Sequence, residues 1–366
     1  MDRFSILIAA LAVLPGALAY AFCGLVARWH VLSDPVSERS NHVAPTSRAG
    51  GAVVMAVLSL SGAAVVFLLP GQRATLVLLG FSGAAALLGL LDDAHALPPV
   101  PKLVVLLSVS IGAALAVGGV PGLPLGIAWL PLPAFLGLPI AVLWIFGFAN
   151  VFNFLDGLNG MAAGTGIVLL VGLGLVSDEQ GLLFLAGASA LLGFAWRNIG
   201  QGAPFLGDAG SLGLGTLIAA GALQSAGPRD PLPLFLIAAA ALPFVADAAV
   251  TMAQRFRAGA ALMTAHSEHA YQRLRRAGHS HDVVSLTYTA LAAIVLALGL
   301  ALRGLDAWLP IPLALLSLVL WTVAVRRLFR SAAYADRTKE ESANPSSVSR
   351  SGEGGRTDKA SAAASA

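Results

Sequence analysis

The sequence predicts an all-α membrane protein that crosses the bilayer many times. Of its 366 residues, 57% are hydrophobic and only 11% are charged, and the mean hydropathy is +0.81. Soluble domains carry about 25% charged residues, so this composition excludes an ordinary soluble protein. The apolar residues form long runs, and most basic residues lie in every second connection between these runs. Together these observations predict a polytopic helical bundle.

Each apolar run of roughly 17–25 residues can cross a bilayer as one helix. There are eleven such runs, and because the sixth and seventh are short, we predict about 10–11 transmembrane helices. The first run could instead be a signal peptide, but it is long and lacks a small-residue cleavage site before Arg28, so we keep it as a span. The predicted spans are 4–27, 50–69, 74–91, 103–119, 133–149, 161–176, 181–196, 209–226, 232–253, 284–302 and 307–325.

The basic residues predict the orientation, because loops rich in Lys and Arg stay in the cytoplasm. With the N-terminus outside, the outer side carries Arg3, Arg73, Arg229 and Arg303. The inner loops then carry Arg28, Arg39, Arg48, Lys102, Arg197, Arg255, Arg257, Arg273, Arg275 and Arg276. The loops predicted to face the cytoplasm are 28–49, 92–102, 150–160, 197–208 and 254–283.

The C-terminal segment differs from the rest of the chain. Residues 331–366 are rich in Ser, Ala, Gly and charged residues, which cannot bury an apolar core. We therefore predict a membrane domain over residues 1–330, followed by a disordered cytoplasmic tail over residues 331–366. Cys23 is the only cysteine in the sequence, which excludes an internal disulfide.

The polar clusters of the chain all fall in predicted inner loops. Asp92 and Asp93 are adjacent carboxylates at the end of a span, so they repel unless a cation lies nearby or one of them takes up a proton. Both properties suit phosphate chemistry, through a metal ion or a general base. The alternative for this pair alone is a solvated, negatively charged end of a helix. The sorting of the clusters to one side favours an active site that faces the cytoplasm.

Two further segments carry amides and carboxylates beside apolar runs. Asn150, Asn153 and Asp156 lie in Asn-Val-Phe-Asn-Phe-Leu-Asp-Gly, and polar groups at such positions are costly unless they have a function. Asp208 lies in Gly-Asp-Ala-Gly-Ser211, where glycines allow close approach of a ligand. Such side chains supply the hard oxygen ligands that Mg²⁺ prefers. Asp208 or Ser211 could instead cap the following helix.

Basic and aromatic residues gather in the last inner loop. His266, His269 and Arg273 lie there together with a tyrosine, and such a loop can hold a nucleotide diphosphate through Arg contacts and ring stacking. The alternative is a basic loop that rests on anionic lipid. Arg48 of the first inner loop and Lys102 of the second add cations that could receive a lipid phosphate. Neither a Walker A motif nor a dinucleotide fingerprint occurs in the sequence.

Taken in their order along the sequence, these motifs resemble those of the polyprenyl-phosphate N-acetylhexosamine-1-phosphate transferase family, which includes MraY and the WecA-type enzymes. The resemblance covers residues 34–282 and rests on Asp-Asp, N-x-x-N-x-x-D-G, G-D-x-G-S and the late His-containing loop. It implies a bacterial inner-membrane enzyme that transfers a sugar 1-phosphate from a UDP-sugar to undecaprenyl phosphate and releases UMP. It also implies Mg²⁺, with Mn²⁺ as a possible substitute.

The resemblance also assigns roles to residues. Catalytic roles are implied for Asp92, Asp93 and Asp156, and metal ligation for Asp208. Substrate binding is implied for Asn150, Asn153, His266 and His269, and we add Arg273, Arg48 and Lys102 because of their charge. Asn159 stands where many family members have a second aspartate, and we leave it outside the catalytic set.

The departures from the family pattern bear on the sugar. Asn159, the Pro-Thr-Ser-Arg-Ala-Gly-Gly sequence of the first inner loop and the His-Ser-Glu-His sequence of the late loop are similar to the WbpL-like branch, which begins O-antigen or capsule chains with amino sugars of the FucNAc or QuiNAc type. The alternative within the family is a GlcNAc-1-phosphate transferase of the WecA type. One sequence does not reveal which UDP-N-acetylamino sugar is used.

Other classes explain the sequence less well. A transporter would place polar residues near the bilayer midplane, whereas here they lie at one interface. A structural scaffold would leave the sorted carboxylates without a purpose. The expected partners are the two substrates and membrane lipids, with no nucleic acid because the basic groups lie beside lipid. The sequence leaves the oligomeric state open, including a possible homodimer.

Overall fold

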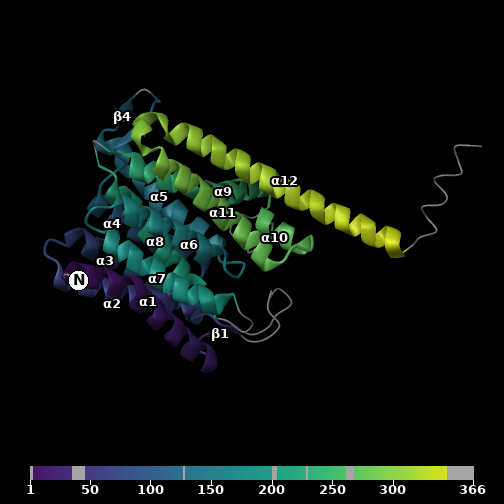
Figure 1. Cartoon of the computed structure of the whole chain (residues 1–366), viewed down its shortest axis with the longest axis horizontal. Helices are drawn as coiled ribbons and strands as arrows, with labels where there is room; N and C mark the ends of the chain where they lie inside the picture. Colours follow the sequence, from purple (N-terminus) through teal and green to yellow (C-terminus); the bar gives the residue numbers. More distant parts are fainter. Residues whose placement is uncertain are drawn as a thin grey trace, which may run out of the picture.

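The structure is a computed structural model that describes residues 3–34, 46–126, 128–199, 204–227, 230–260 and 268–343. Within these ranges, eleven long helices lie side by side in one bundle (Figure 1). They are α1 (Arg3–Arg28), α2 (Gly50–Leu68), α3 (Arg73–His95), α4 (Pro99–Val117), α5 (Ala134–Phe154), α6 (Met161–Val176), α7 (Gly181–Asn198), α8 (Gly207–Ser225), α9 (Leu232–Arg257), α11 (His281–Ala301) and α12 (Pro310–Ala343). Each overlaps one predicted span, so the all-α polytopic fold is confirmed.

Eight of these helices are long and apolar enough to cross a membrane, namely α1 to α5, α9, α11 and α12. The other three, α6 to α8, are shorter or less apolar. They lie inside the protein, and α8 is buried without a break from Ala209 to Leu223. A helix that is enclosed by other helices does not contact lipid, and its small residues let neighbouring backbones approach closely. This explains why α7 and α8 can be less apolar than a lipid-facing span, whereas α6 is apolar but short.

Several helices extend beyond the predicted spans into the predicted inner loops. α3 continues to His95 and ends where Ala96 takes a left-handed conformation with φ of 48°, and α4 then begins at Pro99. A left-handed residue ends a helix, and proline is favoured in the first turn of the next one. Asp92 and Asp93 therefore lie in the last turn of α3. Likewise, Asn150 and Asn153 lie within α5 rather than in a loop.

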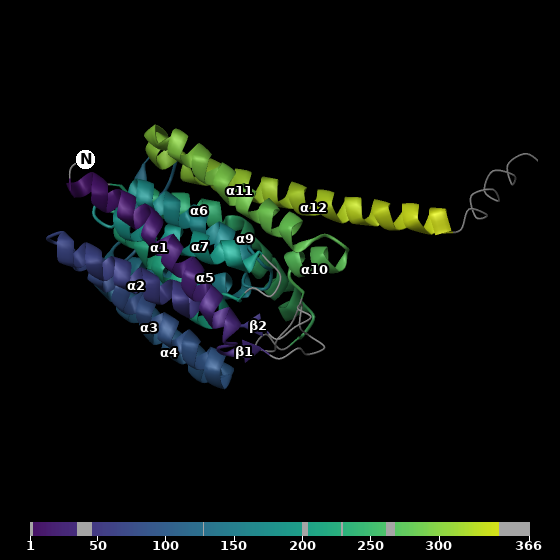
Figure 2. The same cartoon turned by 60° about the horizontal axis from the view of Figure 1, so that its bottom comes forward.

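Short elements mark the two ends of the bundle (Figures 1 and 2). At one end, β3 (Gly122–Pro124) pairs with β4 (Trp129–Pro131) in the connection between α4 and α5. At the other end lie the short helix α10 (Ala270–Arg276) and the pair formed by β1 (Ser33–Asp34) and β2 (Thr46–Ser47). We call this second end the site end, because α3, α5 and α9 finish there and α4 and α8 begin there.

α12 is longer than the predicted span. The helix continues past residue 330 to Ala343 and projects beyond the site end of the bundle (Figure 1). Its last part is rich in Arg, Ala, Lys and Glu, which are good helix formers. The predicted disorder from residue 331 onward is therefore wrong for residues 331–343. Residues 344–366 lie outside the described part of the chain, so for them the prediction stays a prediction.

Candidate active site

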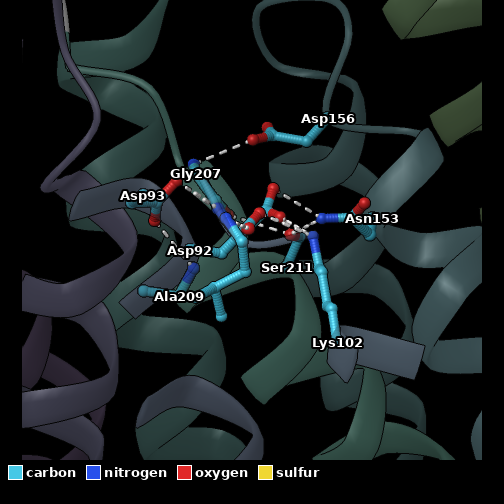
Figure 3. A network of polar contacts seen from close by, with 10 residues as sticks. Asp92, Asp93, Lys102, Asn153, Asp156, Gly207, Ala209 and Ser211 are labelled. Atoms are coloured by element: carbon cyan, nitrogen blue, oxygen red, sulfur yellow. Dashed lines mark hydrogen bonds and ion pairs between the residues drawn. The ribbon is translucent and has the colours of Figure 1, made fainter. Parts of the chain in front are cut away.

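The ends of four helices bring the predicted polar residues together at the site end (Figure 3). Although these residues are far apart in the sequence, their side chains contact one another or the same short piece of backbone. α3, α4, α5 and α8 and the turn after α5 supply, in order, Asp92 and Asp93, Lys102, Asn153, Asp208 and Asp156. The structure thus assembles six of the predicted site residues into one network.

Lys102 lies at the centre of this network, between two carboxylates. Its Nζ is 2.8 Å from Oδ2 of Asp92, and it also contacts Oδ2 of Asp208. The side chains of Asp92 and Lys102 are each 18% exposed and that of Asp208 is 26% exposed, so small polar molecules can reach them. The other oxygen of Asp208 accepts a hydrogen bond of 2.8 Å from the amide of Asn153. One ammonium group therefore balances two partly accessible carboxylates.

The N-terminus of α8 is capped by carboxylates from other parts of the chain. The backbone N–H groups of Asp208 and Ala209 each donate to Asp93 over 3.0 Å, and that of Gly207 donates to Asp156 over 2.9 Å. The first N–H groups of a helix have no partner within the helix, and its dipole favours negative charge there. Asp93 and Asp156 therefore hold the start of α8 in place.

Neither cap that the sequence suggests is formed within α8. Oγ of Ser211 donates to the carbonyl of Gly207 over 2.9 Å and accepts from the amide of Asn153 over 2.8 Å. Asp208 directs its carboxylate to Lys102 and Asn153 instead of to its own helix. The carboxylate of Asp208 faces the accessible side of the network. This position favours a role in binding a ligand over a role as a helix cap.

Close approach of the chains depends on two glycines. Gly207 has a φ of +65°, and a Cβ on it would lie 2.8 Å from Oδ2 of Asp93 and 2.6 Å from the carbonyl oxygen of Arg48. Gly89 of α3 packs so tightly against α8 that a Cβ would overlap the carbonyl of Asp208. Left-handed backbone and contacts of this kind require glycine. These glycines let α3 reach the start of α8, which brings Asp92 and Asp93 to Asp208.

Asp156 is in an unusual electrostatic environment. Loss of hydration raises the pKa of its carboxyl group well above the ordinary value, and the negative charge of Asp208 raises it further. The N–H group of Gly207 acts in the opposite direction. A raised pKa is frequent at functional sites, which agrees with the predicted importance of this residue.

Two predicted residues, Asn150 and Arg48, lie beside the network. The amide of Asn150 donates to the carbonyl of Phe146 in its own helix over 2.7 Å. Arg48 precedes α2 and lies near the start of α8, where its charge acts on Asp93. The anion-binding role of Arg48 stays a prediction, and the side chain of Asn150 has a hydrogen bond within α5.

The late loop forms a second polar cluster around α10. His266 lies outside the described residues. His269 is buried, and its Nδ1 is 3.6 Å from Oδ1 of Asp247 on α9. Arg273 is exposed, and its guanidinium lies over the ring of Phe329 at 5.5 Å. The structure thus gives His269 and Arg273 partners within the protein and does not bring them into the first network.

Asp247 was missed by the sequence analysis. It is buried within the predicted span 232–253 and accepts hydrogen bonds from the backbone N–H groups of Ala270 and Tyr271 and from the hydroxyl of Tyr288. A carboxylate inside an apolar run is costly and therefore informative. That signal was present in the sequence, but the partners of Asp247 lie in later segments.

The donors at the first network fit a magnesium ion in chemical type. Asp92, Asp208 and Asn153 offer hard oxygens, and the ammonium of Lys102 lies where a cation is needed between two carboxylates. Among the described residues no group of three or more His, Cys, Asp or Glu side chains is arranged to enclose a metal ion. An ion here would therefore need phosphate oxygens or water to complete its shell, which is usual for Mg²⁺.

Comparison with known proteins shows the family of the chain. The sequence pattern of the family "Glycosyl transferase family 4" matches residues 75–226, which run from α3 to α8 and carry the whole first network. The chain is 30% identical over 293 residues to the decaprenyl-phosphate N-acetylglucosaminephosphotransferase of Mycobacterium tuberculosis (strain CDC 1551 / Oshkosh), which covers 68% of this chain and 70% of that protein.

Two further relatives carry related names. Over 252 residues the chain is 31% identical to the phospho-N-acetylmuramoyl-pentapeptide-transferase of Cutibacterium acnes (strain DSM 16379 / KPA171202), covering 56% of this chain and 69% of that protein. Over 294 residues it is 26% identical to the "Probable undecaprenyl-phosphate N-acetylglucosaminyl 1-phosphate transferase" of Bacillus subtilis (strain 168), covering 75% of this chain and 78% of that protein. The chain therefore belongs to the polyprenyl-phosphate N-acetylhexosamine-1-phosphate transferases of glycosyl transferase family 4.

Proposed function

We propose that this protein transfers an N-acetylamino-sugar 1-phosphate from a UDP-sugar to undecaprenyl phosphate and so begins a lipid-linked surface glycan. The observation that carries the proposal is Lys102 between Asp92 and Asp208 at one end of a bundle of membrane helices. Such an arrangement suits a reaction between a lipid phosphate and a nucleotide diphosphate. Family membership supports the same general reaction.

In the net reaction, an oxygen of the lipid phosphate forms a bond to the phosphorus that carries the sugar. The bond between this phosphorus and the oxygen that bridges to UMP breaks, and UMP leaves with the bonding electron pair. No oxidation or reduction occurs. Several negative charges meet in this step, and their electrostatic stabilisation is usually the largest catalytic contribution.

The four carboxylates of the first network divide into two pairs by what their oxygens contact. Asp93 and Asp156 bind the backbone of α8, so their proposed role is to fix the position of Asp208. Asp92 and Asp208 would hold Mg²⁺, which supplies positive charge to the phosphates when it is bound. Lys102 would then turn its positive charge toward the substrate phosphates, and Arg48, near Asp93 and the start of α8, would add a second cation.

The place of the network in the bundle fits the two substrates. An undecaprenyl chain lies in the bilayer, and its phosphate lies at the interface, whereas a UDP-sugar comes from water. A site at the ends of membrane helices is open to both. The excess of Arg and Lys at this end supports a cytoplasm-facing site in the bacterial inner membrane.

The identity of the sugar has two candidates. The printed names of the mycobacterial and Bacillus relatives favour N-acetylglucosamine as the transferred sugar. Asn159 and the His-Ser-Glu-His sequence favour an amino-deoxy sugar such as FucNAc or QuiNAc, and with it an O-antigen or capsule pathway. A panel of donors separates these possibilities.

The test is transfer of labelled sugar phosphate from a panel of UDP-sugars to undecaprenyl phosphate by the purified full-length protein. We expect a lipid-linked product with one donor, release of UMP, and loss of the product with EDTA. A parallel assay with decaprenyl phosphate measures how strictly the lipid length is read. Absence of product from folded protein with every donor would overturn the proposed reaction, and a product that resists EDTA would remove the metal from it.

A further inference from the structure

The turn between α5 and α6 carries Asp156 and begins after Phe154, the neighbour of Asn153, and α10 contacts the end of α5 there. Tyr271 of α10 is buried, and its hydroxyl donates a hydrogen bond of 2.6 Å to the carbonyl of Phe154. Phe154 is the last residue of α5, where carbonyl groups have no partner within the helix. The phenol therefore satisfies a backbone acceptor immediately beside the first network.

The fit between this phenol and the turn is close. A Cβ added to Gly157 would lie only 2.5 Å from the hydroxyl oxygen of Tyr271. Burial raises the pKa of Tyr271 well above its ordinary value, so the hydroxyl keeps its proton and remains a donor. The contact with the Phe154 carbonyl is thus fixed in both shape and chemistry.

Tyr271 is itself held by a buried carboxylate. Asp247 accepts hydrogen bonds from the backbone N–H groups of Ala270 (2.8 Å) and Tyr271 (3.2 Å), and these bonds cap α10. The ring of His269 stacks on that of Tyr271 with a centroid distance of 5.5 Å and an angle of 13°. These contacts fix both the backbone and the ring of Tyr271 before it meets the turn.

A second buried tyrosine shares the same carboxylate and provides a matched comparison. The hydroxyl of Tyr288 on α11 donates to Asp247 over 2.7 Å and accepts from the indole N–H of Trp321 over 3.2 Å. Both tyrosine side chains are almost completely buried. Of these two hydroxyls, that of Tyr271 contacts the end of α5, whereas that of Tyr288 contacts Asp247 and Trp321.

We propose that Tyr271 is a positioning residue for the transfer reaction, acting through the carbonyl of Phe154. Its hydroxyl sets the end of α5 and the following turn, which places the amide of Asn153 on Asp208 and the carboxylate of Asp156 on Gly207. Asp247 and His269 serve this role by holding α10. The inference rests on the proposed function, because its effect is on the rate of that reaction.

The test compares Tyr271→Phe with Tyr288→Phe in the full-length protein. Each variant removes one buried hydroxyl, so both are expected to lower the melting temperature to a similar extent. We expect Tyr271→Phe to lower kcat by about tenfold or more with KM for both substrates nearly unchanged, because a misplaced catalytic group slows the reaction step. Tyr288→Phe removes one contact of Asp247 but leaves the hydrogen bond from Tyr271 to Phe154 in place, so it should lower kcat by less than about threefold.

Equal kcat values in the two variants would overturn the proposal, since loss of a buried hydroxyl would then have the same effect at either place. Gly157→Ala offers a second approach, because its Cβ would displace the Tyr271 hydroxyl while the tyrosine remains. It should reproduce the fall in kcat, and normal turnover in a folded Gly157→Ala protein would contradict the proposal.

Hydrogen exchange separates this inference from the proposed function, because it needs no substrate. Backbone amides of residues 155–160 should exchange about tenfold faster in Tyr271→Phe than in Tyr288→Phe. Faster exchange in a protein that transfers no sugar phosphate would support the positioning role and reject the function. Equal exchange in an active protein would reject the positioning role alone.

Discussion

The carboxylate of Asp93, in the last turn of α3, accepts the backbone N–H of Asp208 at the start of α8 over 3.0 Å. Residues 115 positions apart are joined by this bond, and it directs the side chain of Asp208 toward Lys102. Asp93 thus connects two of the sequence motifs through the backbone rather than through substrate. Its partner in the acidic pair, Asp92, instead contacts Lys102 directly.

Replacing Asp93 should therefore affect both stability and activity. In Asp93→Asn, an NH₂ group takes the place of one acceptor oxygen, which leaves an N–H of α8 without a partner. The cost of one such buried donor is about 1–3 kcal/mol. We expect a lower melting temperature in detergent and a rate reduced by at least about tenfold. Asp178→Asn, at an exposed position between α6 and α7, is the control and should change neither.

Replacing Lys102 should leave two neighbouring carboxylates without their cation. Lys102→Met preserves the length of the side chain but removes its charge, and we expect the transfer rate to fall by about a hundredfold or more. Arg303→Met removes an exposed charge at the opposite end of the bundle, in the 3₁₀ helix η1 (Arg303–Trp308), and should leave the rate unchanged. A fall of less than about threefold in Lys102→Met would show that its charge does not serve the substrates.

The proposed metal site predicts a specific change in the magnesium requirement. Asp208→Asn keeps the size of the side chain but removes the charge that would bind Mg²⁺. We expect the Mg²⁺ concentration for half-maximal transfer to rise by about tenfold or more, together with a lower maximal rate. The measurement is a titration of activity with Mg²⁺ after treatment with EDTA. If the titration curve of the variant coincides with that of the unchanged protein, Asp208 is not a ligand.

Two glycines with a left-handed backbone allow the cost of backbone strain to be measured separately from the cost of crowding by neighbouring atoms. Gly207 and Gly71 both have a positive φ, but only Gly207 has neighbours within 4 Å of an added Cβ. Gly71→Ala should cost only the backbone strain of about 1–2 kcal/mol. Gly207→Ala should cost more and abolish transfer, because the Cβ would push Asp93 and the carbonyl of Arg48 away from α8. Thermal unfolding and transfer assays on both variants test this, and equal effects would refute the tight fit at Gly207.

Deletion of residues 344–366 should leave transfer nearly intact. This segment is rich in Ser, Gly and charged residues and cannot contribute an apolar core. The deletion leaves all of α12 in place, since that helix ends at Ala343. We expect kcat and the melting temperature to remain within error of those of the full-length protein. An inactive but folded truncation would assign a role to the tail.

The sequence by itself determined the class of fold and the end of the bundle where the site lies. Helices that contact lipid need long apolar runs, and the enclosed helices α6 to α8 are also mainly apolar, so hydropathy located all eleven long helices of the described chain. Polar residues beside such runs are energetically costly, so they stand out in the sequence. Among them, Asp92, Asn153 and Asp208 also belong to recognisable motifs. Once the helices alternate in direction, these motifs must meet at one end.

Only the tertiary structure decided which groups contact each other. Asp93 and Asp156 bind the backbone of α8, and Lys102 lies between Asp92 and Asp208. Both arrangements depend on how closely α3 and α8 pack, and the sequence pattern does not specify this distance. The same holds for Tyr271, whose partner Phe154 is 117 positions away. Local patterns determine where helices begin and end, but contacts between distant segments follow from the packing of all the helices together.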